Sequence, residues 1–262
     1  MSRNSDRPSR RDQVTFTRNT ARYVNKRFNV SNPFERVLIL LVVAVVVGVM
    51  VGVVLPKISP EVGELTGEYV ASGPAADVLE TLRVDDDQSG DGYDRDLFGY
   101  RETDDDGDGC DVRDEVLARD LEDVTFTTPG GCQVQFGVLH DLYTGKTIDF
   151  VRGPQTSSAV QIEHVVALEN AWQSGARDWD TAKRYKFGND MYNLLAADGE
   201  ANSEKGSASA AYWLPTNADF RCEYVARQIG VKDKYDLSVT TQEKRAMLSV
   251  LRSCPGQEVP AE

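Results

Sequence analysis

Residues 162–168 read Ile-Glu-His-Val-Val-Ala-Leu, which places Glu163 and His164 side by side at the end of an apolar run. A second apolar run, Asn-Leu-Leu-Ala-Ala, follows at residues 193–197, and Asn-Ser-Glu-Lys occupies residues 202–205. The asparagine and the lysine of this last stretch are three residues apart, so on a helix they would face the same way. The order predicts a strand, a turn, a second strand and a helix that converge on one site.

The residue types of these three stretches fit the cleavage of phosphodiesters. A histidine beside a carboxylate can act as a general base next to a metal ion, and an asparagine can supply an oxygen ligand to a hard cation. A lysine adds a positive charge where a phosphate would bind. Together, a base, an oxygen-ligand metal site and a cation are the groups that metal-assisted hydrolysis of a phosphodiester uses.

The same stretches resemble the HNH, or ββα-metal, endonucleases, in particular the extracellular actinobacterial type, a family once labelled only as a domain of unknown function. Four flanking sequence segments also resemble that family: Gly-Tyr-Asp-Arg-Asp-Leu-Phe at 92–98, Tyr-Thr-Gly-Lys-Thr at 143–147, Ala-Trp-Gln-Ser-Gly-Ala at 171–176 and Trp-Leu-Pro at 213–215. The resemblance covers roughly residues 92–254, so it does not depend on one short motif.

The resemblance implies a role for each of five residues. Neutral His164 would take a proton from the water that attacks phosphorus, so its pKa must lie near or below the working pH. Glu163 would bind the metal or position a ligand, and Asn202 would hold Mg²⁺ or Mn²⁺ through its side-chain oxygen. Asn193 would hydrogen-bond the backbone across the hairpin and hold His164 in place, and Lys205 would pair with phosphate.

Four of these five residues have a plainer structural alternative, and for His164 it is a hydrogen-bonded structural histidine. A strand-end surface carboxylate would account for Glu163, a helix-start asparagine for Asn202 and a solvated helix lysine for Lys205. One position also departs from the family pattern: many relatives have an aspartate just after the Lys-Gly pair, where this chain has Ser207. Any supporting role of that acid is therefore missing, or another carboxylate takes it.

Five further cations flank the motif as candidate phosphate contacts, although each could equally be an ordinary surface charge. They are Arg95, Lys146, Arg152, Lys183 and Arg184. The second histidine of the chain, His140, is interpreted as structural.

Residues 104–115 fit the formula of a calcium-binding loop, with Asp104, Asp106, Asp108, Cys110 and Glu115 as the candidate calcium residues. The eighth position is an aspartate where an apolar residue normally packs, and no long amphipathic helix precedes the loop. A single structural Ca²⁺ loop is therefore favoured over a pair of calcium-sensor hands. A flexible acidic loop is the alternative. Residues 85–96 repeat the composition more loosely.

Residues 37–55 form an uninterrupted apolar run without a charge, just long enough for a helix that spans a bilayer. Nine basic and three acidic residues precede it, so the positive-inside rule places the N-terminus in the cytoplasm and the remainder outside. A cleaved signal peptide is the alternative, with an unusually long charged leader and no small-x-small site closely after it. We therefore expect an uncleaved anchor.

The part beyond the leader holds 20 basic and 39 acidic residues, a net charge of −19. Such a charge repels polyanions and argues against tight, non-specific binding to DNA. It fits a nuclease only if the acids cluster away from the cleft or bind cations.

All four cysteines lie beyond the apolar run, an even number in an oxidising location. Of the three possible pairings, Cys110–Cys132 with Cys222–Cys254 is preferred, because each pair closes a loop of moderate length. Zinc binding is disfavoured because the chain has no Cys-x-x-Cys spacing.

The sequence therefore predicts an α+β domain: a ββα-metal core within a mostly helical domain with short antiparallel strands, preceded by one transmembrane helix. The predicted organisation is a basic leader (1–36), a transmembrane helix (37–55), a linker (56–74), the nuclease domain (75–254) and a tail (255–262). Strands are expected at 132–139 and 147–151, and helices at 75–84, 114–121, 181–187, 217–229 and 240–252. Residues 165–173 are expected to be a helix or an extended turn.

The predicted function is a membrane-anchored, extracytoplasmic, metal-dependent endonuclease that cuts DNA, with RNA as a further candidate, and shows little sequence specificity. No small-molecule organic cofactor is expected. One alternative is a calcium-stabilised cell-surface binding module with a decayed nuclease site, which the acidity and Ser207 favour. Another is a phosphodiesterase that acts on a non-nucleic envelope polymer.

Overall fold

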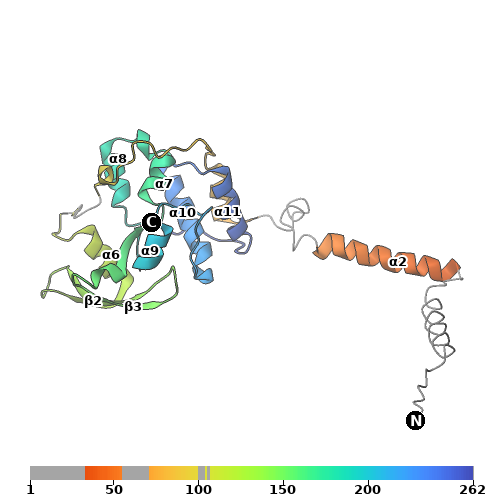
Figure 1. The fold of residues 1–262 in the computed structure, drawn as a ribbon, viewed down its shortest axis with the longest axis horizontal. Coiled ribbons are helices and arrows are strands. Elements are labelled where there is room, and N and C mark those ends of the chain that lie inside the picture. The colour runs from red at the N-terminus through yellow and green to blue at the C-terminus, as the bar shows by residue number, and fades with distance from the viewer. Residues whose placement is uncertain (1–32, 55–70, 100–103, 105–106, 262) are drawn as a thin grey trace, which may run out of the picture. The chain divides into compact units, whose positions relative to one another are not determined.

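The computed structural model describes residues 33–54, 71–99, 104 and 107–261, and Figure 1 shows the chain as a ribbon. By its internal contacts the chain divides into two units, Met1–Tyr69 and Val70–Glu262. Residues 1–32 of the predicted leader, Leu55, most of the predicted linker and Asp106 lie outside the described residues.

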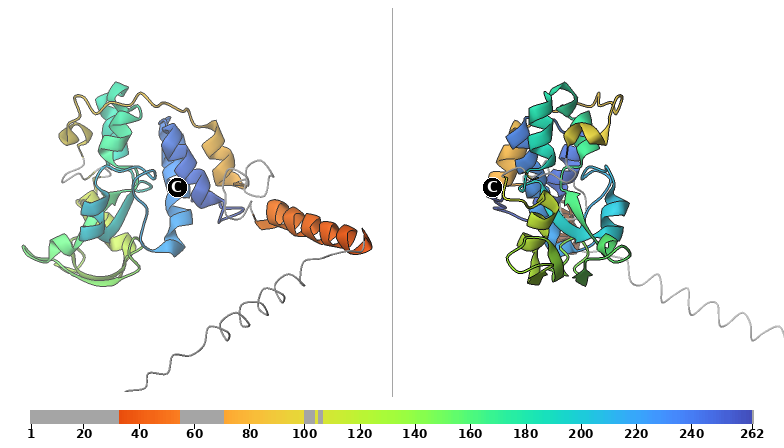
Figure 2. Two further views of the ribbon diagram at one scale, coloured as in Figure 1. Left: turned by 45° about the vertical axis from the view of Figure 1, so that its right-hand side comes forward. Right: turned by 90° about the vertical axis from the view of Figure 1, so that its left-hand side faces the viewer.

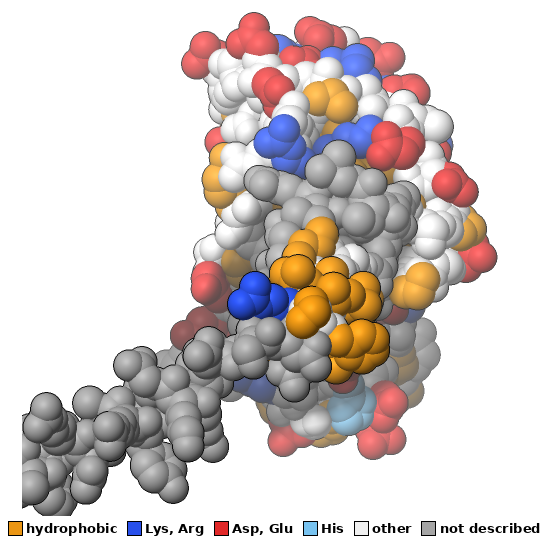
Figure 3. All heavy atoms as spheres, turned by 90° about the vertical axis from the view of Figure 1, so that its right-hand side faces the viewer, with side chains coloured by type: hydrophobic (Ala, Val, Ile, Leu, Met, Phe, Trp, Pro, Cys, Tyr) orange, Lys and Arg blue, Asp and Glu red, His pale blue; other side chains and the backbone are white. Residues whose placement is uncertain are grey.

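The described part of the first unit is one helix. It begins as α2 (Pro33–Val49) and ends as a π-helical turn, η1 (Met50–Val54). Residues 36–54 have a mean hydropathy of 3.4, and their side chains are exposed, as the hydrophobic surface in Figure 3 shows. A helix that is apolar all round needs an apolar environment. By length and composition it is the one helix among the described residues that could cross a membrane, and a signal sequence would meet the same criterion.

The second unit contains two antiparallel sheets. The larger has the order β1 (Leu121–Phe126), β2 (Val134–His140) and β3 (Thr147–Val151). Residues 141–146 form the tight turn between β2 and β3, where Asp141 accepts a hydrogen bond of 2.7 Å from the Thr144 backbone. Gly145 has a φ of +74°, a backbone conformation that favours glycine.

The smaller sheet pairs β4 (Val160–His164) with β5 (Leu194–Asp198), in a register that places His164 opposite Leu194. Between the two strands lie α7 (Leu168–Gln173), η4 (Ala176–Asp178) and α8 (Thr181–Gly188). Helix α9 (Gly199–Lys205) follows β5 directly. The predicted order of strand, strand and helix is thus present, with helices between the strands rather than a simple turn.

The remaining elements are mostly helices. They are α5 (Pro74–Thr81), η2 (Arg95–Phe98), α6 (Val112–Asp120), η3 (Ser157–Ala159), η5 (Ala218–Phe220), α10 (Arg221–Tyr235) and α11 (Thr241–Leu251). Their starts follow local rules: Asp111 caps α6, Asp180 caps α8, and Thr240 with Glu243 forms a capping box on α11. Figure 2 shows α5 beside α10 and α11, where all three helices share one apolar cluster.

Three apolar clusters surround the smaller sheet, and β4 and its exit contribute one valine to each. Val160 belongs to the cluster of the larger sheet and α6, Val165 to the cluster of α5, α10 and α11, and Val166 to the cluster of α7 and α8. Glu163 and His164 therefore lie where the three clusters meet. Because each valine is held by a different part of the core, the backbone at these two residues is fixed from three sides.

The α+β class is confirmed, and most predicted elements are present within a few residues. Strand β1 was not predicted, because most of its side chains are exposed and Asp123, at a φ of +52°, accompanies an irregular register with β2. Both preferred disulfides, Cys110–Cys132 and Cys222–Cys254, are present, with Cα–Cα distances of 5.7 and 6.2 Å.

Candidate functional site

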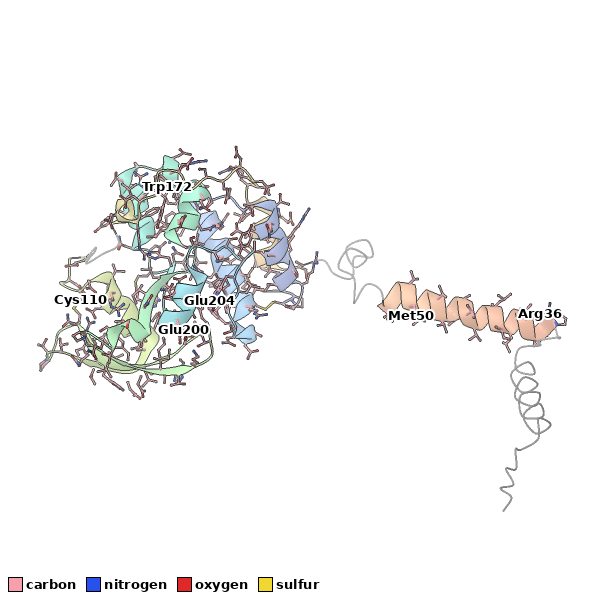
Figure 4. The ribbon with its side chains drawn as sticks, viewed as in Figure 1. Arg36, Met50, Cys110, Trp172, Glu200 and Glu204 are labelled. Carbon is pink, nitrogen blue, oxygen red and sulfur yellow. A yellow bond between two sulfur atoms is a disulfide. The ribbon has the colours of Figure 1, made fainter. Side chains whose placement is uncertain are left out.

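One cleft brings together residues from three distant parts of the sequence. Its volume is about 290 Å³, and its lining includes Arg95 from η2, Glu163 and His164 from β4, and Asn202 from α9. Helix α9 carries the side chains of Glu200 and Glu204 that Figure 4 labels. Because His164 and Asn202 both line the cleft, the imidazole and the amide that are predicted to cooperate lie on the same side of the fold.

His164 is buried, and its Nε2 lies 2.8 Å from the carbonyl oxygen of Gly188. A carbonyl oxygen only accepts, so Nε2 carries the proton and Nδ1 is the unprotonated nitrogen of the neutral ring. The pKa of His164 is lowered to about 4, mainly because the ring is buried. The hydrogen bond to Gly188 raises the pKa, and the positive charges of Arg95 and Lys205 lower it. At neutral pH the imidazole is therefore uncharged and able to accept a proton.

Gly188, at the end of α8, links His164 to the helical turn that carries Arg95. A Cβ atom on Gly188 would lie only 2.7 Å from the carbonyl oxygen of Phe98, the last residue of η2. Only a residue without a side chain lets η2 approach this closely. The same residue thus sets the position of η2 and binds the histidine.

Glu163 and Lys205 form a buried ion pair in which Lys205 Nζ lies 2.5 Å from Glu163 Oε1. The same ammonium donates a hydrogen bond of 3.1 Å to the carbonyl oxygen of His164. Burial raises the pKa of Glu163, and the charge of Lys205 partly opposes that rise. Lys205 therefore ties the last turn of α9 to the end of β4, and its ammonium is not at the surface.

Asn193 makes the backbone contacts that were expected of it. Its Oδ1 accepts a hydrogen bond of 2.8 Å from the Val166 N–H, and its Nδ2 donates one of 3.1 Å to the Val166 carbonyl. Its own carbonyl accepts from the Val165 N–H at 2.8 Å. These bonds fix the chain directly after His164. The contribution of Asn193 to catalysis stays a prediction.

Asn202 lies on α9 and donates a hydrogen bond of 2.8 Å from Nδ2 to Oε1 of Gln161 on β4. This contact assigns the orientation of the Asn202 amide, so Oδ1 is the atom that a cation would bind. Gln161 was not predicted as a site residue, although it lies two positions before Glu163 on a strand, and that spacing puts both side chains on the same face.

Of the five predicted phosphate contacts, Arg95 lines the cleft. Lys146 lies in the turn after β2 and pairs with Asp198 at 3.3 Å. Arg152 pairs with Asp114 and also donates to a carbonyl of β2. These two cations thus contact groups of the fold itself.

Lys183 and Arg184 both lie on α8. Lys183 donates to the Tyr235 carbonyl at 3.2 Å, and the guanidinium of Arg184 lies 5.8 Å from the ring centre of Trp172. Neither these two cations nor Lys146 and Arg152 are among the described residues that line the cleft. If these four cations contact the substrate as predicted, they do so outside the cleft.

The acidic loop is held by its own backbone in the part that the structure describes. Asp104 accepts hydrogen bonds from the Gly107 and Gly109 N–H groups at 2.7 and 3.0 Å, and Asp108 accepts one from the Cys110 N–H. No group of three or more His, Cys, Asp or Glu side chains placed to hold a metal occurs among the described residues. The Ca²⁺ site stays a prediction.

The aspartate at the eighth position of this loop has a structural explanation. The side chain of Asp111 accepts a hydrogen bond of 2.7 Å from the Asp114 N–H and caps α6. An N-terminal cap prefers a short side chain with an oxygen acceptor, which an apolar residue lacks. The departure from the calcium-loop formula therefore reflects the helix that begins there.

The segment of the chain that carries most of these residues matches a known protein family. Residues 111–250, more than half of the chain, match the family described as GmrSD restriction endonucleases, C-terminal domain. An uncharacterized secreted protein of Arthroderma benhamiae is 37% identical over 186 residues, which cover 70% of this chain and 86% of that protein. No solved structure matches. The matched segment contains Glu163, His164, Asn193, Asn202 and Lys205.

Proposed function

The chain belongs to the family of GmrSD restriction endonuclease C-terminal domains, and we propose that it hydrolyses phosphodiester bonds of nucleic acids with an HNH-type, ββα-metal site. One observation carries the proposal: Arg95, Glu163, His164 and Asn202 line one cleft although they come from three separate segments. The family supports a nuclease function and a nucleic acid substrate. The HNH assignment rests on the β4–β5–α9 arrangement around that cleft.

His164 is the proposed general base. Its Nδ1 takes a proton from water while the water oxygen forms a bond to phosphorus and the bond from phosphorus to the leaving ester oxygen breaks. The leaving oxygen then takes a proton from solvent. The hydrogen bond from Nε2 to Gly188 and the pKa lowered to about 4 both support an imidazole that is neutral and correctly oriented.

Glu163 and Asn202 fit a loosely held hard cation. The donor set is a carboxylate and an amide oxygen, which suits Mg²⁺ or Mn²⁺ with further coordination by water and phosphate oxygens. Such an ion would supply positive charge at the phosphate where negative charge develops. Within the chain, Gln161 orients the Asn202 amide, and Lys205 fixes the position of the Glu163 carboxylate.

Lys205 is proposed as a positioning residue rather than as a phosphate contact. Its side chain is fully buried, and its ammonium binds Glu163 and the His164 carbonyl. Arg95, which lines the cleft, is the better placed cation for a substrate phosphate. A planar guanidinium can donate two parallel hydrogen bonds to such a group.

The proposed location is outside the cytoplasm, with residues 37–55 as a membrane anchor. The apolar helix is compatible with either a signal or an anchor, and the relative from Arthroderma benhamiae is described as secreted. Two disulfides also fit an oxidising compartment. The nine basic residues before residue 37 would stay on the cytoplasmic side.

The test is a plasmid-nicking assay of the full chain in detergent with Mg²⁺, Mn²⁺ or EDTA. Wild type is expected to nick DNA with either ion and to stop with EDTA. His164→Ala should reduce the rate by about 100- to 10,000-fold, the usual contribution of general base catalysis. His140→Ala is the matched control, because His140 is the other histidine of the chain and lies exposed on β2. Cleavage that survives His164→Ala rules out the assigned base.

The alternative, a binding module whose nuclease site has decayed, is favoured by the ion pair, because Lys205 already neutralises the carboxylate proposed to bind metal. A decayed site should show no metal-dependent turnover. If Ca²⁺ then raises the melting temperature while no ion produces nicks, the binding module replaces the enzyme.

A further inference from the structure

A second cavity lies beside the catalytic cleft. Its volume is about 600 Å³, and side-chain amides and hydroxyls make up most of its lining, which includes Gln88, Asn170, Gln173, Ser207, Ser209 and Gln242. We call it the polar pocket.

The polar pocket and the catalytic cleft share two walls. Gly206 lines the cleft while its neighbour Ser207 lines the pocket, so the two linings are about 3.8 Å apart at this turn, the distance between successive Cα atoms. Helix α7 separates the two cavities, because Leu168 at its start lines the cleft and Asn170, two positions on and on another face of the helix, lines the pocket. Gly206 and Ser207 are both exposed, so a polymer that leaves the cleft over this turn reaches the pocket.

The polar pocket offers few charges to a ligand. Lys205 is the one cation among the described residues that line it, and its ammonium is paired with Glu163. The carboxylate of Asp86 accepts hydrogen bonds of 2.6 Å from both the N–H and the hydroxyl of Thr241. The remaining polar groups donate and accept hydrogen bonds without charge. Such a lining suits a neutral polar group better than a phosphate.

Tyr212 adds an aromatic surface to the pocket. It is 75% exposed, and its hydroxyl donates a hydrogen bond of 3.0 Å to Gln242. That bond holds one end of the ring while its faces remain open to solvent. An exposed, anchored ring is what a nucleobase stacks on, and side-chain amides are the groups that pair with base edges.

We propose that the polar pocket binds the nucleobase of the nucleotide next to the phosphate held in the cleft, with the base stacked on Tyr212. This inference rests on the proposed nuclease function. A base enters a pocket only after it leaves its stack, so an unpaired strand is the preferred substrate. Stacking and uncharged hydrogen bonds need no basic surface, which explains how a unit of such negative charge can bind nucleic acid.

The experiment compares two substrates with the full chain in Mn²⁺: a single-stranded oligonucleotide and bis(p-nitrophenyl) phosphate, a diester without a nucleobase. For Tyr212→Ala, the ratio of kcat/KM for the oligonucleotide to kcat/KM for the base-free diester should fall by roughly 5- to 150-fold, the size of one stacking contact. Tyr212→Phe keeps the ring and should lose less. Phe126→Ala is the control, since this exposed ring on β1 lines neither cavity.

Wild type should also cleave the single strand faster than the same sequence in a duplex. An unchanged ratio in Tyr212→Ala overturns the inference. A second outcome would also overturn the inference: wild type binds a neutral oligosaccharide such as chitotetraose, and Tyr212→Ala abolishes that binding but leaves oligonucleotide binding intact.

The two proposals fail in different ways. If wild type hydrolyses neither substrate, the nuclease function is overturned, and the pocket is tested by fluorescence anisotropy of the labelled single strand in CaCl₂. A fivefold or greater loss of affinity in Tyr212→Ala then supports the base-binding pocket, and equal affinity overturns it. Circular dichroism spectra of the variants exclude misfolding as the cause.

Discussion

Lys205 Nζ lies 2.5 Å from Glu163 Oε1, and the two side chains are 0% and 6% exposed. The pair joins the last residue of α9 to the strand residue next to the proposed base. Both charges are removed from water, so each depends on the other for compensation. The position of Glu163 in the cleft is therefore inseparable from the packing of α9.

Lys205→Met is expected to destabilise the protein by about 3–5 kcal/mol, because it leaves the Glu163 carboxylate buried without the ammonium that pairs with it. The double variant Lys205→Met/Glu163→Gln should recover much of this loss, since no buried charge remains. Urea denaturation followed by tryptophan fluorescence measures both. Equal stability of the single variant and wild type would show that Glu163 reaches water or another cation.

Gly188→Ala is expected to slow DNA cleavage by about 10- to 100-fold, since small displacements of reacting groups carry losses of this size. The new Cβ would lie 2.7 Å from the Phe98 carbonyl oxygen, so α8 or η2 must move. Either movement displaces the carbonyl that binds His164 or the turn that carries Arg95.

Gly153→Ala is the matched control for this substitution. Its Cβ would lie 2.8 Å from the hydroxyl of Thr156, the end of a side chain that can rotate away. Nicking rates at equal protein concentration compare the two variants. A Gly188→Ala protein as active as Gly153→Ala would show that the contact between α8 and η2 does not set the site.

Asp198 predicts a specific dependence of stability on pH. Its carboxylate is partly buried, which raises its pKa, but hydrogen bonds from the Ala201 and Glu200 N–H groups and from Lys146 outweigh burial and leave the pKa below its usual value. A carboxyl group with a lowered folded-state pKa stabilises the fold above its unfolded pKa of about 3.9, and this contribution disappears as the pH falls through the folded value.

Asp198→Ala should therefore cost about 1 kcal/mol at pH 7, the usual value of a lost helix cap. The difference from wild type should shrink as the pH falls below about 4, where the wild-type carboxyl takes up its proton. Urea titrations at pH 7, 5, 4 and 3 measure the difference. A difference that grows toward low pH would contradict the assignment of the charged carboxylate as the cap of α9.

The two disulfides should each stabilise the fold. Cys222–Cys254 joins the first turn of α10 to the residues after α11 across 32 positions, and Cys110–Cys132 closes 22 positions. The double variant Cys222→Ser/Cys254→Ser should lose about 3–4 kcal/mol, from the entropy that the closed loop removes from the unfolded chain.

Cys110→Ser/Cys132→Ser should lose slightly less, because its loop is shorter. Thermal melting followed by near-ultraviolet circular dichroism measures both variants. Peptide mapping without reductant provides the independent check, and any peptide that links Cys110 to Cys222 or Cys254 would contradict the pairing.

Local sequence rules were sufficient for much of the fold. Asp180 before Thr181 indicated the start of α8, because a short acceptor side chain satisfies the first free N–H groups of a helix. Helix α11, Thr241–Leu251, lies within the predicted range 240–252. Alternating apolar residues indicated β2, observed at Val134–His140, and the turn after it indicated β3 at its observed bounds, Thr147–Val151. Strand β1 carried no such signal, since it pairs at the edge of its sheet with most side chains exposed.

The amino-acid sequence was enough to indicate the chemical groups of the candidate site, the order of β4, β5 and α9, the apolar span before them and the preferred cysteine pairs. These features depend on residue type and on spacing along the chain. Which cations reach the cleft became clear only from the packing of the fold: Arg95 lines it, while Lys205 lies buried against Glu163. Spacing places Asn202 and Lys205 on one side of a helix, but which of them meets solvent depends on the core that packs around that helix.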